Sequence, residues 1–191
     1  MNNLVSTITS LNKEVSYKSL NDLLSLTTFE KLPKKIILCK EGEIPEDVYF
    51  IKSGIIRAYI TNASGIEFNQ AFFFDDNFAG AFSALTQKKP SKITLECLTN
   101  CEVLRAKYYE VDDLLKQNVE LATFGRKLFE KIFSSFEKRT LELATLSATD
   151  RYKKFITSYS HIADVIPQYH IASFLGITPI QLSRIKKELR K

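Results

Sequence analysis

The stretch IASFLGITPIQLSRIKKEL, from Ile171 to Leu189, has the pattern of two short helices joined by a tight turn. Ala172 is small enough for a close helix crossing, and Gly176 tolerates the left-handed backbone that such a turn needs. Thr178 followed by Pro179 is a strong helix start, because a hydroxyl caps the helix and proline suits its first position. The stretch therefore predicts a helix-turn-helix.

The second helix of this motif has one apolar side. Leu182 and Ile185 lie three residues apart and are expected to face the core. Its other side stays free, as in a recognition helix that enters the major groove of DNA. The candidate DNA-binding residues on that side are Thr178, Gln181, Ser183, Arg184 and Lys187.

These side chains have different expected roles. Arg184 is the expected base reader, because its guanidinium can bridge two acceptors of guanine. Gln181 is expected to read adenine or to bind phosphate, and Ile180 to contact a thymine methyl or pack on the neighbouring helix. Phosphate contacts are expected from Ser183, Lys186, Lys187, Arg190 and Lys191.

The charge distribution supports this interpretation. The chain of 191 residues has a net charge of +5. Residues 151–191 hold 8 Lys and Arg against 2 Asp and Glu, a balance of +6, whereas residues 1–150 hold 19 against 20, a balance of −1. A compact basic segment on a nearly neutral body favours a polyanionic partner. An ordinary helical hairpin with a solvated charged face is the alternative, and turn, cap and charge together favour double-stranded DNA.

The first half of the chain has a different pattern. After a helical segment at residues 2–28, it contains the short β-rich segments KKIILC, DVYFIK, IIRAYIT, EFNQAFFF, KITLEC and CEVLRAK. Turn signals such as Asn62-Ala63-Ser64-Gly65 separate them. Many short strands at regular spacing predict an antiparallel barrel or sandwich.

A long helical segment connects the two halves. Its apolar stripe comprises Leu121, Phe124, Leu128, Ile132 and Phe136, at steps of three and four residues. A helix of this length is difficult to cover by packing on one small barrel, so we expect a homodimer formed by these residues. One long helix lying along its own domain is the alternative. Ser135 and Arg139 interrupt the seam, so it is not a strict zipper.

These segments predict an α+β protein with three parts. They are a sensor barrel with an N-terminal helix at residues 1–117, a dimerisation helix at 118–146 and a helix-turn-helix domain at 147–191. No apolar run approaches a membrane span, and residues 1–10 lack the pattern of a signal peptide, so we expect a cytoplasmic protein with no membrane contact.

Several classes of function are not expected. Cys39, Cys97 and Cys101 are odd in number and form no CxxC motif, so they are expected to be reduced, packed thiols. His161 and His170 both lie outside the barrel, against the histidine cluster of a metal-dependent barrel enzyme, and His170 is expected to be a partly buried helix residue. No nucleophile elbow, P-loop or dinucleotide fingerprint is present. We therefore expect no enzymatic activity, no cofactor and no metal.

Three stretches resemble the Crp/Fnr family of bacterial transcription regulators. EGEIPEDVYFIKSGIIRAYI is similar to a segment of the family's barrel, DDNFAGAFSAL resembles the start of its phosphate-binding cassette, and IASFLGITPIQLSRIKKEL is the closest match. The resemblance implies a jelly-roll barrel of cyclic-nucleotide-binding type and a dimer with two recognition helices one DNA turn apart. RNA polymerase is a further expected partner. Only two residues follow the recognition helix, so the family's wing is expected to be absent or shortened.

The resemblance also locates a candidate effector pocket, at Phe78, Gly80, Ala81, Phe82, Ser91 and Lys92. Members that bind cAMP carry Glu where Ala81 stands and Arg near Ser91 or Lys92. Because both polar anchors are missing, we expect an unknown effector other than cAMP. A cyclic-nucleotide-responsive regulator and a ligand-free dimeric interaction module remain as alternatives.

Overall fold

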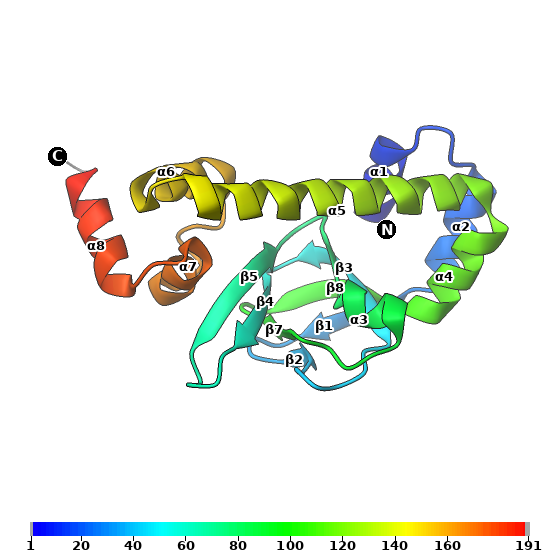
Figure 1. Ribbon diagram of the computed structural model, residues 1–191. Coiled ribbons are helices and arrows are strands. Elements are labelled where there is room, and N and C mark those ends of the chain that lie inside the picture. Colours follow the sequence, from blue (N-terminus) through cyan, green and yellow to red (C-terminus); the bar gives the residue numbers. More distant parts are fainter. Residues whose placement is uncertain (1, 190–191) are drawn as a thin grey trace. The chain divides into compact units, whose positions relative to one another are not determined.

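The computed structural model describes residues 2–189 (Figure 1). The chain divides into two compact units. The barrel unit comprises Met1–Ala58 and Phe72–Ile132, and the helix-turn-helix unit comprises Tyr59–Ala71 and Phe133–Lys191. The division runs through the long helix, and a segment of the strand region belongs to the unit that carries the helix-turn-helix. The residues after Leu189, where the shortened wing and two phosphate contacts are expected, lie outside the described residues.

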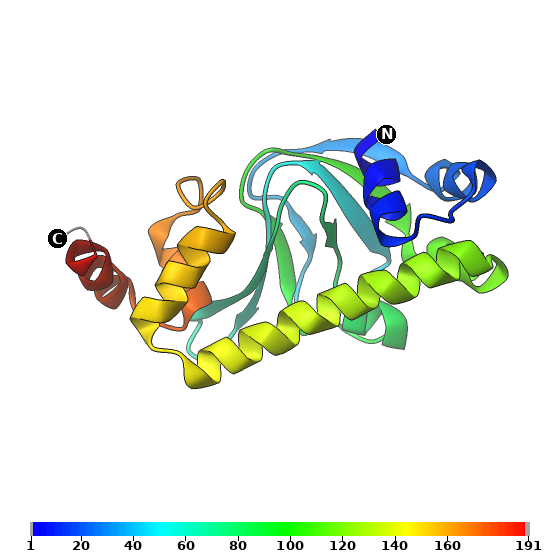
Figure 2. The ribbon, with the colours of Figure 1, turned by 90° about the horizontal axis from the view of Figure 1, so that it is seen from above.

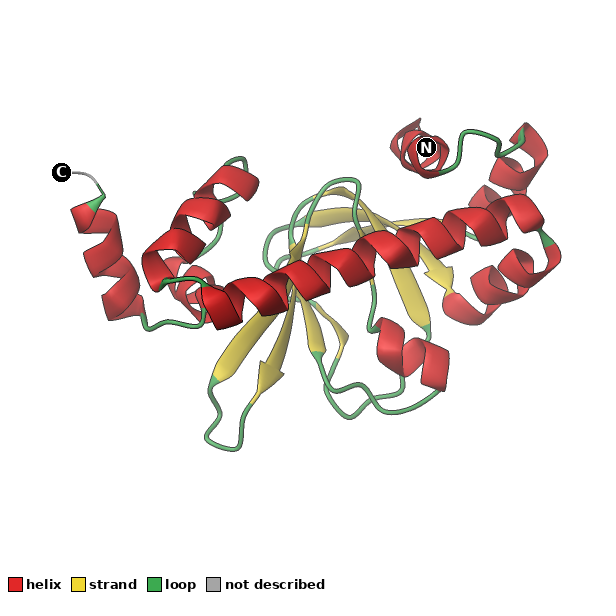
Figure 3. Ribbon diagram, turned by 45° about the horizontal axis from the view of Figure 1, so that its top comes forward, coloured by secondary structure: helices red, strands yellow, loops and turns green. Residues whose placement is uncertain are grey.

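Eight short strands form two four-stranded sheets (Figure 3). The first sheet has the order β1-β8-β3-β6, and its pairs are antiparallel. The second has the order β2-β7-β4-β5. The strands are β1 (Thr28–Leu32), β2 (Ile37–Cys39), β3 (Asp47–Ser53), β4 (Ile56–Thr61), β5 (Glu67–Phe73), β6 (Phe78–Ala79), β7 (Thr94–Cys97) and β8 (Cys101–Lys107). The predicted α+β class with an antiparallel strand region is confirmed.

The two faces of the first sheet bury different clusters. Neighbouring residues of a strand point to opposite faces. Ile51 packs inward with Cys97, Cys101 and Val103, whereas Phe50 belongs to a second cluster on the outer face. The three cysteines are buried free thiols, as predicted.

Two N-terminal helices cover this outer face (Figure 2). They are α1 (Asn2–Leu11) and α2 (Tyr17–Ser25). The N-cap of α2 is Ser16, whose hydroxyl accepts from the Ser19 amide at 3.3 Å. Glu120 accepts from the Ser16 amide at 2.8 Å and from the Ser19 hydroxyl at 2.7 Å. These bonds hold the pKa of Glu120 below its ordinary value and fix the long helix to α2.

The remaining helices are α3 (Phe82–Gln87), α4 (Tyr108–Gln117), α5 (Val119–Thr145), α6 (Ala148–Ser158), α7 (Gln168–Leu175) and α8 (Pro179–Glu188). The long helix is therefore confirmed. Asn118 separates α4 from α5 and accepts from the Leu121 amide at 3.1 Å. Gly125 permits close contact of the two helices, because a Cβ there would overlap Leu115. Within residues 2–189, no helix has both the length and the apolar character needed to cross a membrane.

Replacing Gly54 by alanine is expected to lower the free energy of unfolding by about 2–3 kcal/mol. Gly54 has φ of +104°, and a Cβ there would lie 2.6 Å from the Asn100 carbonyl oxygen and 2.7 Å from the Cys101 sulfur. Gly42 is the matched control, because it has φ of +90° but nothing within 4 Å of its Cβ position. Its alanine variant should lose only about 1 kcal/mol in urea unfolding. Equal losses would show that the close contact at Gly54 has no effect.

Candidate nucleic-acid interface

Helices α7 and α8 form the predicted helix-turn-helix. Gly176 ends α7 in a left-handed conformation, with φ of 66° and ψ of 35°. Its amide donates to the Ser173 carbonyl at 3.1 Å, and the Ile177 amide donates to the Ala172 carbonyl at 3.0 Å. These bonds satisfy the last carbonyls of α7. They require the left-handed backbone at position 176, and glycine is suited to it because it has no Cβ.

A reciprocal cap fixes the start of α8. The Thr178 hydroxyl accepts from the Gln181 amide at 3.2 Å, and the Gln181 Oε1 accepts from the Thr178 amide at 3.0 Å. Pro179 occupies the first turn, as predicted. The sequence analysis assigned Thr178 and Gln181 to DNA, but their side-chain oxygens form this cap. Gln181 therefore has its Nε2 left for another contact, which points to a phosphate or base acceptor rather than to a bidentate contact.

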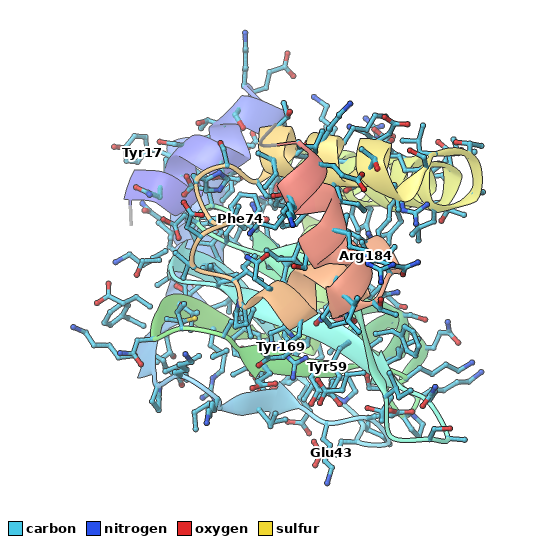
Figure 4. All side chains as sticks on the ribbon, turned by 90° about the vertical axis from the view of Figure 1, so that its left-hand side faces the viewer. Tyr17, Glu43, Tyr59, Phe74, Tyr169 and Arg184 are labelled. Atoms are coloured by element: carbon cyan, nitrogen blue, oxygen red, sulfur yellow. The ribbon has the colours of Figure 1, made fainter. Side chains whose placement is uncertain are left out.

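The inner side of α8 is apolar. Leu182 and Ile185 are only 1% and 7% exposed, and α7 buries Ile171, Ala172 and Leu175 in the same region. This arrangement leaves Ser183, Arg184 and Lys187 exposed on the other side of α8, and Figure 4 labels Arg184 there. Ile180 is also 67% exposed, so it does not pack on the neighbouring helix. The structure thus brings the three candidate polar contacts together on one free face.

Lys186 differs from these residues. It is partly buried, and its ammonium donates to the Gln168 side-chain oxygen at 2.9 Å. A depression of about 470 Å³ separates this part of α8 from the start of α7, and Ser183 and Lys187 also line it. An oxygen-rich anion would find amide, hydroxyl and ammonium groups in this depression.

Two partly buried arginine side chains hold α7 in place, a role that the sequence pattern did not indicate. Arg151 of α6 donates to the Leu175 carbonyl at 3.0 Å and to the Leu146 carbonyl at 2.6 Å. Arg139 of α5 donates to the Phe174 carbonyl at 2.6 Å and lies 3.6 Å from the centroid of the Phe174 ring. Burial lowers the pKa of Arg139 to about 10, so it remains a cation at neutral pH.

A segment of β5 belongs to the same unit and bonds to α7. The Ser173 hydroxyl donates to the Glu67 carbonyl at 2.8 Å and accepts from the Asn69 amide at 2.9 Å. The Asn69 side-chain nitrogen lies 3.2 Å from His170 Nδ1. Arg139 also donates to the Asn69 carbonyl at 3.1 Å. His170 is thus a helix residue, as expected, but it is fully buried rather than partly buried, and polar residues that are distant in sequence fix the position of α7.

The predicted dimerisation stripe divides into two groups. Leu121 and Phe124 are 0% and 4% exposed and belong to the core of the barrel unit, with Leu128 packed against them. Leu121 and Phe124 are therefore unavailable to a partner, which corrects their assignment. Ile132 is half-buried and Phe136 is 37% exposed. The sequence analysis left out Phe133, which is 69% exposed on the same helix.

The six candidate effector residues are also divided. Phe78 and Phe82 line an apolar cavity whose walls include neither Gly80, Ala81, Ser91 nor Lys92. Ser91 is buried, and its hydroxyl donates to the Ile93 carbonyl at 2.7 Å. Lys92 is exposed, and Ala81 is buried without a polar side-chain atom. The structure therefore does not gather these six residues into one nucleotide pocket.

A buried arginine in the barrel unit was also missed by the sequence analysis. Arg57 of β4 is 4% exposed, and its Nε donates to Glu96 of β7 at 2.9 Å. Because this guanidinium is bound by a carboxylate, it is already neutralised and is poorly placed to compensate a ligand phosphate. The sequence shows an arginine in one strand and a glutamate in another, which is compatible with an ion pair between them. Whether the two side chains meet depends on the order of the strands in the sheet, which the sequence does not give.

Comparison with known proteins relates this chain to one domain family and to several solved structures. Residues 29–118 match the cyclic nucleotide-binding domain. The anaerobic regulatory protein of Haemophilus influenzae is 25% identical over 173 residues, which cover 84% of this chain but only 66% of that relative. The solved structure of FixK2 from Bradyrhizobium japonicum has a TM-score of 0.76 at 19% identity, covering 86% of this chain and 84% of that one. The c-di-GMP responsive regulator CLP of Xanthomonas campestris has a TM-score of 0.70 at 16% identity, with 92% of both chains covered. Residues 29–118 therefore match one domain family, and the fold of the chain is similar to that of solved regulators, which include a transcriptional regulator of the Crp/Fnr family from Eubacterium rectale with a TM-score of 0.73 at 16% identity, covering 94% of this chain and 86% of that one.

Proposed function

We propose that this protein regulates transcription by binding double-stranded DNA as a homodimer, with α8 of each subunit in the major groove of one half of a roughly palindromic operator. The observation that carries the proposal is the capped helix α8, whose apolar side is buried and whose Arg184, Ser183 and Lys187 are free on the other side. RNA polymerase is a further partner in this proposal.

The electrostatics agree with a DNA partner. Residues 151–191 carry the balance of +6, and of their basic side chains Arg184 and Lys187 lie on the free face of α8. Each cation that neutralises a phosphate releases counterions, which makes binding favourable and dependent on salt. Arg184 has the geometry for two parallel bonds to one base, whereas the ammonium of Lys187 supplies a point charge.

The decisive test is selection of bound sites from a random pool of duplex DNA. The proposal expects a recovered sequence with two related half-sites whose centres lie about one helical turn apart. Mobility shifts with random duplex at two salt concentrations then separate DNA binding from a protein-binding module. A protein that binds no duplex at either salt concentration would contradict the proposal.

Replacing Arg184 by alanine is expected to relax sequence preference at one base pair and to cost about 1–3 kcal/mol on the selected operator. Replacing Lys187 by alanine should weaken binding to all duplexes alike and reduce the salt slope by about 1. Both side chains are exposed, so neither change removes a core contact. Competition titrations with the operator and a scrambled duplex measure the difference. Sequence-independent losses of equal size for both variants would remove the base-reading role from Arg184.

The effector of this regulator is proposed to be a molecule other than cAMP. Ala81 offers no acceptor for a ribose hydroxyl, and the buried Arg57 is bound by Glu96. A desolvated cyclic phosphate without a cationic partner would be strongly unfavourable.

A further inference from the structure

A cavity of about 110 Å³ lies within the barrel unit, on the outer face of the first sheet. Its walls come from the strands β3, β6 and β8 and from the helices α1, α2, α3, α4 and α5. Protein interiors contain few voids larger than a water molecule, so a cavity of this size at the junction of eight elements is unusual. For comparison, an engineered apolar cavity of about 150 Å³ stays dry and takes up benzene.

Paired aromatic rings form much of the wall. The Phe78 ring lies 5.1 Å from that of Phe50 and 5.9 Å from that of Phe124, measured between centroids. The Phe82 ring meets that of Phe129 edge to face at 5.6 Å. Phe50 and Phe124 are at most 4% exposed, whereas Phe129 is 41% exposed. Rings held by such pairs cannot easily move inward to fill the space, and the exposed Phe129 marks the side that faces solvent.

The polar groups on the wall restrict the chemistry of an occupant. Asp112 is held by Lys116 in an ion pair of 2.6 Å, and its side chain is 39% exposed. Burial raises the pKa of Tyr108 above its ordinary value, so its hydroxyl is neutral at physiological pH. The lining contains no Lys, Arg or His side chain. A phosphate or carboxylate would therefore find no cation here, whereas an uncharged carbon ring would replace missing van der Waals contacts.

We propose that this cavity binds a small uncharged apolar molecule of about the size of one aromatic ring. The site differs from the predicted nucleotide pocket, because Gly80, Ala81, Ser91 and Lys92 do not line it. It lies against α5, so a bound ring would stabilise the contacts of that helix with the sheet. The proposal is independent of DNA binding, since every lining residue belongs to the barrel unit.

The test is a titration of the full-length protein with toluene, followed by NMR of its methyl groups. We expect saturable shifts in the methyl signals of Leu104, Leu115 and Leu128, which line the cavity. Benzoate and cAMP, at the same concentrations, should leave these signals in place because both are anions. The melting temperature should rise with toluene concentration, as it does when a ligand binds only the folded state.

Two variants that fill the cavity make the test specific. Ala106→Leu adds carbon atoms from β8 and Leu128→Phe adds a ring from α5, and each should weaken toluene binding at least about tenfold. Leu141→Phe is the matched control, because Leu141 is 58% exposed on the same helix and is not part of the cavity. It should bind toluene like the wild type. Because the two filling variants change different elements, failure of one to fold leaves the other as the test.

Three results would overturn the proposal. The first is the absence of methyl shifts at saturating toluene, and the second is unchanged affinity in a folded filling variant. The third is equal binding of benzoate, which would show that the cavity does not discriminate against charge. None of these results depends on DNA, so the DNA-binding proposal and this one fail separately.

Discussion

Replacing Phe133 by lysine will produce a monomer that binds the operator on the order of 10²–10⁴ times more weakly than the wild-type protein. Phe133 is 69% exposed on α5, so the change removes little from the fold of its own subunit. In the proposed homodimer the same residue would face its symmetry mate or a near neighbour across a two-fold axis, so two lysines would be brought together in an apolar seam. A monomer presents one recognition helix at a time and loses the gain in affinity from simultaneous binding of two half-sites.

Sedimentation at micromolar concentration and mobility shifts with the operator measure the two parts of this result. Ser134→Lys is the control, because it adds the same charge at the next position of the helix, which is also exposed, about 100° around the axis from Phe133 and away from the seam that contains Ser135. It should remain dimeric. Replacing Leu128 would be a poorer test, because this side chain packs against the core of the barrel unit. A Phe133→Lys protein that sediments as a dimer would rule out this stripe as the interface.

Replacing Arg139 by methionine is expected to lower the stability of the helix-turn-helix unit by about 2–5 kcal/mol. Methionine keeps most of the chain length but donates no hydrogen bond. The Phe174 carbonyl would lose its donor at 2.6 Å, the Asn69 carbonyl would lose one at 3.1 Å, and the Phe174 ring would lose its cation. Because the Phe174 carbonyl belongs to α7 and Asn69 bonds to Ser173 of the same helix, α7 should open more often.

Native-state hydrogen exchange of the α7 amides measures this local effect, whereas a global melting curve would mix the two units. Arg126→Met is the matched control on the same helix. Arg126 pairs with Glu130 at the surface, and its side chain is 60% exposed. A surface ion pair of this kind contributes at most about 1 kcal/mol, so the α7 amides should be unchanged. Equal protection in the Arg139 and Arg126 variants would show that the partly buried Arg139 guanidinium does not hold α7.

Some features could be predicted from the sequence because they depend on neighbouring residues. The turn at Gly176 and the cap of Thr178 follow from backbone geometry and from one hydroxyl near the amide three residues on. The inward position of Leu182 and Ile185 follows from helix periodicity alone. For the same reason, the 3.6-residue spacing of the apolar residues was sufficient to predict α5, although Ser135 and Arg139 interrupt it.

The candidate site was predicted only in part, because one side chain can serve two partners. The sequence placed Thr178 and Gln181 on the free face of α8, but it did not indicate that the same two side chains bond to each other. Thr and Gln at the start of a recognition helix are suited both to capping the helix and to contacting DNA, so the residue types do not distinguish the two roles. Arg184 and Lys187 lie beyond the capping positions of the helix, so the sequence pattern predicts no capping bond for them. The structure leaves both side chains exposed, as expected.

Other features depend on segments that are far apart in the chain. An apolar stripe is the same in sequence whether it meets its own core or a partner, and only the packing of α1 and α2 shows that Leu121 and Phe124 are core. Arg139 interrupts that stripe because β5 and α7 surround it, and no local rule indicates either neighbour. The position of Phe78 beside Phe50 was set by strand pairing across 28 residues of sequence. The sequence by itself thus determined the helices, their caps and the charge of the last segment, because these depend on bonds within a few residues. The tertiary structure alone decided which apolar and charged side chains are buried, because burial depends on what other parts of the chain place against them.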